Sequence, residues 1–159
     1  MKWRGGGPPP GCRTPTPSPP GPPPLALIPA GETAGEGPPL VLLHANPFDH
    51  SMWLYQIARY ARRYAVVAPD LRGYGRSDKP ETPFTFAEMA ADVLGVVRDR
   101  GYARIALAGV SIGATLALSI ALDHPALVRA LVLVGGEAGS PPVFARLASR
   151  LEQLEAAEL

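Results

Sequence analysis

Short apolar runs alternate with segments of helical periodicity along the middle of this 159-residue chain. The apolar runs predict strands at 25–28, 40–43, 65–68, 105–108 and 130–134. The periodic segments predict helices at 52–63, from Thr85 to Gly101, at 111–123 and at 143–158. Strands that are apolar throughout are typical of a parallel sheet covered on both faces. The sequence therefore predicts an α/β fold, a mostly parallel sheet with helices on both faces.

Two of these helices carry more specific signals. In the helix at 52–63, Trp53, Ile57 and Tyr60 recur at helical spacing and predict a face that packs into the core. Thr85 and Glu88 form a capping-box pattern, in which each residue satisfies a free backbone N–H at the start of a helix. We therefore expect that helix to begin directly after Thr85.

The first 24 residues differ in composition from the rest, because they hold ten prolines and five glycines. Such a segment cannot bury a core, so we expect a disordered tail over 1–24, a folded domain over 25–140 and a helical segment over 141–159. The N-terminus lacks the apolar core of a secretory signal. The single cysteine, Cys12, excludes an internal disulfide, and both features favour a cytoplasmic protein.

Charge and hydropathy argue against two classes of partner. A formal net charge of +1 provides no field for gripping phosphates, so we expect no nucleic acid. Residues 105–122 are 18 residues without a charge, the length of a candidate membrane span. Glycine and hydroxyl residues interrupt this stretch, and a buried strand followed by a buried helix explains it better. We expect no membrane partner.

The sharpest chemical motif is residues 109–113, Gly-Val-Ser-Ile-Gly, between a predicted strand and a predicted helix. A strained turn there exposes the serine hydroxyl at the helix N-terminus, and the glycines let strand and helix approach closely. The N–H groups that follow, with the helix dipole, favour a developing negative oxygen. This is the arrangement that an acyl-transfer nucleophile requires, which makes Ser111 the candidate nucleophile.

Two further motifs precede it. Residues 44–47 read His-Ala-Asn-Pro at the end of an apolar run, and residues 70–77 read Asp-Leu-Arg-Gly-Tyr-Gly-Arg-Ser after the next one. With the Gly-Val-Ser-Ile-Gly turn third in order, residues 25–140 resemble the N-terminal part of the α/β-hydrolase superfamily, as in its esterases, lactonases and haloperoxidases. The resemblance implies a fold cut before its last strands, with 141–159 as the start of a cap.

The resemblance also implies a site. The backbone N–H groups of Asn46 and Ile112 would form the oxyanion hole, although the family has glycine where Ala45 stands. A catalytic acid and then a histidine would follow Ser111 along the chain. Glu137 is a candidate acid, with a plain polar loop residue as the alternative.

No histidine of the chain fits the role of base. The resemblance implies that His44 is structural, and His50 is no stronger a candidate. His124 lies at the far end of the helix that Ser111 begins, and we expect a surface or capping role for it. In the Gly- and Arg-rich loop 72–77, the resemblance implies a structural ion pair for Arg76, with ligand binding as the alternative. No cofactor and no metal are expected.

These features favour a serine hydrolase of a carboxylic ester, lactone or related acyl bond, acting on a small-molecule acyl substrate. A cofactor-free haloperoxidase-like enzyme and a non-catalytic remnant or binding protein remain alternatives. A dehalogenase is disfavoured, because that chemistry places an aspartate at position 111. If the chain ends as given, we expect weak or no activity alone, and self-association through the exposed edge of the strand at 130–134.

Overall fold

The computed structural model describes residues 31–136 and Ser149. Within them, five strands form one sheet in the order β1 (Gly31–Ala34), β3 (Ala65–Pro69), β2 (Pro39–Leu43), β4 (Ile105–Val110) and β5 (Val128–Val134). Strand β2 runs parallel to β3 and β4, and β5 runs parallel to β4, whereas β1 is antiparallel to β3. The predicted α/β fold with a mostly parallel sheet is confirmed.

The antiparallel strand β1 was not predicted. Its sequence, Gly-Glu-Thr-Ala, is not an apolar run, and Glu32 and Thr33 are exposed. The pattern of a doubly covered strand therefore fails at this edge of the sheet. The strand predicted at 25–28, the tail 1–24 and most of the segment 141–159 lie outside the described residues.

The helices follow the predicted order. They are the 3₁₀ helix η1 (His50–Trp53), α1 (Leu54–Tyr60), α2 (Phe86–Asp99) and α3 (Ile112–Asp123). The predicted helix at 52–63 thus starts as a 3₁₀ turn at His50 and ends earlier, at Tyr60. The capping box of Thr85 and Glu88 is present at the start of α2, as predicted.

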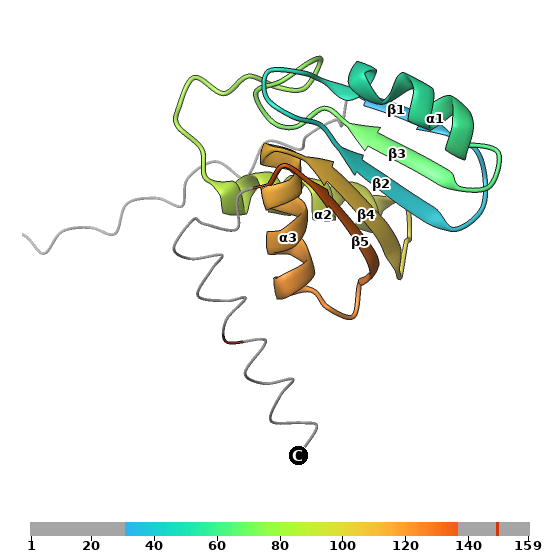
Figure 1. Cartoon of the computed structure of the whole chain (residues 1–159). Coiled ribbons are helices and arrows are strands. Elements are labelled where there is room, and N and C mark those ends of the chain that lie inside the picture. The colour runs from blue at the N-terminus through green and yellow to red at the C-terminus, as the bar shows by residue number, and fades with distance from the viewer. Residues whose placement is uncertain (1–30, 137–148, 150–159) are drawn as a thin grey trace, which may run out of the picture.

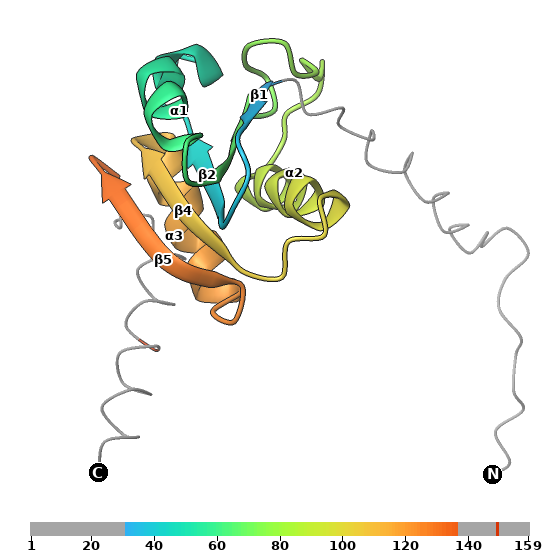
Figure 2. The same cartoon turned by 90° about the vertical axis from the view of Figure 1, so that its right-hand side faces the viewer.

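Helices cover both faces of the sheet. Figures 1 and 2 show α1 on one face and α2 with α3 on the other. Side chains of α2 and α3 pack with β2, β3 and β4 in the larger apolar cluster, and Trp53 and Ile57 pack with the opposite face in a smaller one. Tyr60 does not belong to this buried face, because it is 44% exposed. The prediction of core packing is right for Trp53 and wrong for Tyr60.

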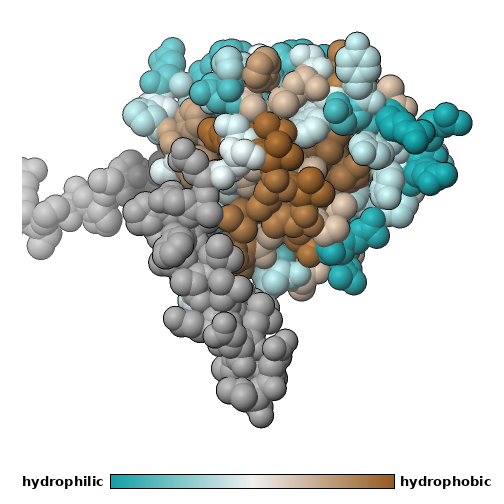
Figure 3. All heavy atoms as spheres, viewed as in Figure 1, coloured by the Kyte–Doolittle hydropathy of each residue, from teal (hydrophilic) through white to brown (hydrophobic). Residues whose placement is uncertain are grey.

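The two edges of the sheet differ. Antiparallel β1 pairs with β3 on one side, whereas β5 is the outermost described strand on the other. Val132, Leu133 and Val134 of β5 are exposed, and Figure 3 shows an apolar area on this side of the molecule. Residues 105–122 divide into β4 and α3, and no described helix is long and apolar enough to cross a membrane.

Candidate active site

Ser111 occupies the single-residue turn between β4, which ends at Val110, and α3, which begins at Ile112. Its φ of 53° and ψ of −120° make it the one non-glycine residue of the described chain with a positive φ. L-residues avoid this region because Cβ crowds the backbone, so the turn is strained. The strained turn expected from the sequence is present, and Ser111 is exposed.

Two glycines make this turn sterically feasible. A Cβ on Gly109 would collide with the backbone of Gly113 and Ala114 in the first turn of α3. A Cβ on Gly113 would collide with the carbonyl groups of Leu43 and His44. The start of α3 therefore lies against the end of β2 with no room for a side chain between them.

The backbone of Ser111 is bonded on both sides, whereas its side chain is not used to cap the helix. The N–H donates to the Val134 carbonyl at 2.9 Å, and the carbonyl accepts from the N–H groups of Ala114 and Thr115 at 2.9 and 3.1 Å. The hydroxyl makes no capping hydrogen bond to α3. The structure thus fixes the backbone and leaves an exposed hydroxyl at the positive end of a helix.

The loop that contains Asn46 follows β2, the neighbour of β4 in the sheet. Leu43 pairs with Gly109 in the parallel register, so the segments after these two strands leave the sheet at the same end. Ala45 is buried and does not have a positive φ, which explains why alanine is accepted there. Asn46 is exposed. Within the described part of the chain, no acceptor takes the N–H groups of Asn46 or Ile112.

His44 is a buried structural residue. Its Nε2 accepts the N–H of Leu71 at 2.8 Å, and its Nδ1 lies 2.9 Å from the Ala45 carbonyl, so Nδ1 carries the proton. The ring also packs edge-on against Tyr74, with 5.2 Å between centroids. Burial lowers the pKa of His44 more than its backbone contact with Ala45 raises it. Both ring nitrogens are occupied, so His44 is not placed to take a proton from Ser111.

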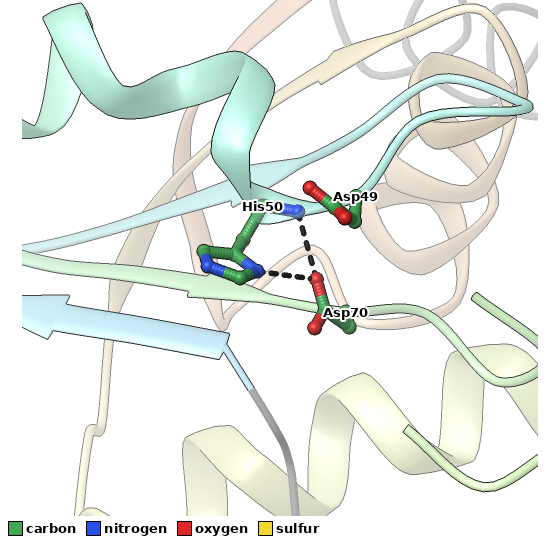
Figure 4. Close-up of side chains that lie close together, drawn as sticks. All are labelled: Asp49, His50 and Asp70. Atoms are coloured by element: carbon green, nitrogen blue, oxygen red, sulfur yellow. Dashed lines mark hydrogen bonds and ion pairs between the residues drawn. The ribbon is translucent and has the colours of Figure 1, made fainter. Parts of the chain in front are cut away.

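A second histidine, His50, forms a pair with Asp70 at the start of η1 (Figure 4). The Oδ1 atom of Asp70 accepts both the backbone N–H and the Nδ1–H of His50, each at 2.7 Å. The other ring nitrogen, Nε2, lies 3.4 Å from Nη2 of Arg76, which also donates to the Gly31 carbonyl in β1. Through Arg76 the pair is linked to β1, which β3 and β2 separate from β4 in the sheet, and no hydrogen bond among the described residues joins it to Ser111.

The third histidine, His124, is the C-cap of α3 and is exposed, in agreement with the expected capping role. The twelve residues of α3 separate it from Ser111 by about 18 Å at 1.5 Å per residue. No histidine among the described residues is therefore positioned as a base for Ser111. The candidate acid Glu137 lies outside the described residues.

Asp70 is the centre of a network that the sequence did not predict. Its side chain is fully buried, and Oδ2 accepts the backbone N–H of Arg76 at 3.0 Å. Burial alone would raise the pKa of this carboxyl, but the N–H donors of Arg76 and His50 outweigh it and hold the pKa below its usual value. A Cβ on Gly75 would collide with the Asp70 carboxylate. In the sequence, the signal for this contact is the glycine at position 75, five residues after Asp70.

Asp49, His50 and Asp70 also bring three potential metal-ligand atoms within 4.8 Å of one another. Asp70 already accepts from His50 and Arg76, and Asp49 accepts the N–H of Ser51 at 2.8 Å. The guanidinium of Arg76 lies 4.0 Å from Asp70 and supplies positive charge there. We assign these side chains to the hydrogen-bond network rather than to a metal site.

The loop 72–77, which follows β3, contains an ion pair of Arg72 that is shorter than the ion pair expected for Arg76. Arg72 binds Asp92 of α2 through two hydrogen bonds of 2.7 Å, which raise the pKa of its guanidinium. Arg76 does form the expected ion pair, with Asp70 at 4.0 Å, but its side chain is 63% exposed. Since Arg72 is committed to Asp92, this loop does not resemble a phosphate-binding loop.

Known proteins share this arrangement of sequence and fold. A soluble epoxide hydrolase from Corynebacterium sp. is 41% identical over 102 residues, covering 64% of this chain and 36% of the relative. A fluoroacetate dehalogenase from Burkholderia sp. is 38% identical over 105 residues, covering 63% and 34%. The solved structure of a thermophilic esterase from Thermogutta terrifontis is 32% identical, with a TM-score of 0.65, covering 70% and 42%.

The chain thus spans about a third of the length of these curated relatives. The sequence profile of the alpha/beta hydrolase fold matches residues 38–153, which include the Asn46 loop, the Asp70 loop and the turn at Ser111. With the parallel sheet and the strained strand-to-helix turn, this match settles the relationship. The chain belongs to the α/β-hydrolase family.

Proposed function

We propose that this protein is a serine hydrolase that cleaves a carboxylic ester, lactone or related acyl bond, with Ser111 as the nucleophile. One observation carries the proposal: Ser111 has a strained backbone, is exposed, and its hydroxyl is not used to cap α3. A strained residue at the N-terminus of a helix is typical of functional sites rather than of stable turns.

In the proposed mechanism, Oγ of Ser111 attacks the carbonyl carbon of the substrate and forms a tetrahedral intermediate. The backbone N–H groups of Asn46 and Ile112 donate to its oxyanion, which the N-terminal dipole of α3 also favours. A histidine that is not among the three of this sequence takes the serine proton and delivers it to the leaving group. Water then hydrolyses the acyl-enzyme, and Glu137 is a candidate for the acid that orients the histidine.

The identity of residue 111 selects among the activities of the relatives. Two of the relatives are named as an epoxide hydrolase and a dehalogenase. Attack by a serine hydroxyl on an epoxide or halogen-bearing carbon would leave an ether on the enzyme, which water does not cleave. Attack on a carbonyl gives an ester, which water does cleave. Serine at position 111 therefore favours acyl substrates, as for the esterase among the solved structures.

The proposal is tested with a fluorophosphonate probe and peptide mapping of the adduct. Because the chain supplies no base, we expect wild-type protein to be labelled at Ser111 only slowly and with a large excess of probe, and Ser111→Ala to lose the label. Ser119→Ala, which removes a buried hydroxyl from the same helix, should be labelled like wild type. Turnover of p-nitrophenyl acetate by this chain should remain near background, because no described histidine is placed as the base. Equal labelling of Ser111→Ala, or an adduct on another residue, would contradict the proposal.

A further inference from the structure

The loop that carries Asn46 is held at both ends by two consecutive residues after β3. At its start, Nε2 of His44 accepts the N–H of Leu71 at 2.8 Å. At its end, the N–H and the ring of His50 donate to Oδ1 of Asp70, each at 2.7 Å. Asp70 and Leu71 thus fix the two ends of the loop, residues 44 and 50.

Between these ends the loop has few supports of its own. Asn46, Pro47 and Phe48 are all exposed, and Phe48 is 56% exposed despite its size. The Ala45 carbonyl accepts the Phe48 N–H and the Nδ1–H of His44, each at 2.9 Å, and the Ala45 N–H contacts Sδ of Met52 at 3.3 Å. Asp49 accepts from the N–H groups of Ser51 and Met52, so no described bond holds Asn46 or Pro47 themselves. An exposed loop of this kind takes its position from the groups that hold its ends.

The end of the loop that Asp70 holds has more hydrogen bonds than the other end. The carboxylate of Asp70 is fully buried, and the Asp70 carbonyl accepts the Ser77 hydroxyl at 2.6 Å. Oδ2 accepts the N–H of Arg76, and Gly75 leaves room for the carboxylate. Four donors, two of them from His50, therefore converge on Asp70, which makes it a rigid support for the end of the Asn46 loop.

We propose that Asp70 is a positioning residue: by holding His50, it sets where the Asn46 loop presents its backbone N–H beside Ser111. This inference rests on the proposed function, in which that N–H receives the oxyanion. An oxyanion donor is effective only when it is fixed in place before the charge develops. Asp70 acts at a distance from the reacting atoms and does not touch them.

The test measures amide exchange by NMR in the full chain. Asp70→Ala should speed exchange at Phe48, whose N–H is bonded to the Ala45 carbonyl, at least about tenfold beyond what its change in global stability explains. Asp92→Asn is the matched control, since it breaks the Arg72 ion pair in the same region and leaves the Asn46 loop bonded. Asp70→Asn keeps an oxygen that can accept from His50, so it should restore most of the slow exchange.

A spectroscopic readout accompanies the exchange rates. Because Nδ1 of His50 donates to Asp70, the Nδ1–H signal should show a hydrogen bond to a carboxylate in wild type and lose this signature in Asp70→Ala. If Asp70→Ala does not fold, His50→Ala keeps the buried carboxylate, and it should speed exchange at Phe48 by a smaller factor.

Two further outcomes separate this inference from the proposed function. Phosphonylation of Ser111 should shift the Asn46 amide signal in wild type and not in Asp70→Ala. If wild-type Ser111 takes no label, the proposed function fails, while the exchange rates still decide whether Asp70 holds the loop. Exchange at Phe48 in Asp70→Ala that matches Asp92→Asn, after correction for stability, would overturn the inference.

Discussion

Helices α2 and α3 both begin after a hydroxyl side chain at the N-cap position, and they use it in opposite ways. Thr85 has an extended backbone, and its Oγ1 accepts the N–H of Glu88 at 3.2 Å, while the Glu88 carboxylate accepts the Thr85 N–H at 2.7 Å. Ser111 has a positive φ and makes no capping bond. The hydroxyl stabilises the helix at α2, whereas at α3 it makes no bond to the helix that it begins.

The start of α3 without a capping bond has a cost that packing must offset. A left-handed residue other than glycine costs about 1–2 kcal/mol, and an absent N-cap bond costs about 1 kcal/mol more. Helix α3 compensates with tertiary contacts, because Leu116, Ala117 and Ile120 are almost fully buried and Gly113 lies against the end of β2. Stability at α2 is therefore local, whereas the start of α3 depends on the sheet.

The largest expected effect comes from one substitution made in both helices. Gly113→Ala should lower the free energy of unfolding by about 3 kcal/mol, because its Cβ would collide with the carbonyl groups of Leu43 and His44. In α2, Gly95→Ala should raise the free energy of unfolding by about 0.5–1 kcal/mol, because the nearest atom lies 3.9 Å from its Cβ and alanine favours helix.

Urea denaturation of the two variants and of wild type measures both changes. Opposite signs would establish that α3 is held by close approach to β2, since the substitution and the secondary structure are the same. A stabilised Gly113→Ala variant would contradict the close approach.

The second effect concerns the strand beside each helix. Helix α2 shares its apolar cluster with Val67 of β3, whose outer edge pairs with β1, whereas α3 packs against both β4 and β5, the outermost described strand on its side. We expect the chain to self-associate through this apolar edge. Val132→Lys should raise the concentration needed for association at least about tenfold in light scattering, because a charge opposes strand pairing.

The control for β5 is an exposed apolar side chain elsewhere. Tyr55 of α1 is 88% exposed, and Tyr55→Lys should leave association unchanged. Wild-type protein that remains monomeric across the whole concentration range would show that β5 is not an association surface.

The features that could be predicted from the sequence are those that depend on local steric rules or on residue periodicity. The turn at Ser111 follows from the glycines around it, and the capping box of Thr85 follows from the spacing of two residues. The Asp70 network escaped prediction because its partner His50 is 20 residues away, and the loop between them sets the contact. Tyr60 has helical spacing to Ile57, but α1 ends at Tyr60 and the ring stays exposed.

The third effect is on the free energy of unfolding when the N-cap residue of each helix is replaced, and it should have opposite signs at Ser111 and Thr85. Ser111→Gly should raise the free energy of unfolding by about 1 kcal/mol, because glycine adopts a φ of 53° without a Cβ clash. Thr85→Ala should lower it by about 1 kcal/mol, because the Glu88 N–H loses its acceptor. Thermal unfolding reports both changes, and phosphonate labelling should be lost only in Ser111→Gly. A destabilised Ser111→Gly variant would argue against strain at this turn.

The smallest effect is a difference in pH dependence between the two helix starts. Burial lowers the pKa of His44, which lies against α3, so the unfolded chain takes up its proton at a higher pH than the folded protein. The free energy of unfolding should therefore fall as the pH drops below about 6.5, by at most about 1.4 kcal/mol per pH unit for one proton. This loss stops once the pH is below the folded pKa.

At α2, hydrogen bonds from Thr85 lower the pKa of Glu88, so its contribution is kept at neutral pH and lost only in stronger acid. Urea unfolding at pH 7.5 and 5.5 separates the two groups. His44→Asn should flatten the dependence in this window, because an amide does not titrate, and Glu88→Gln should leave the slope as in wild type. An unchanged slope in His44→Asn would place the titrating group elsewhere, and the start of α3 would then be no more sensitive to pH than that of α2.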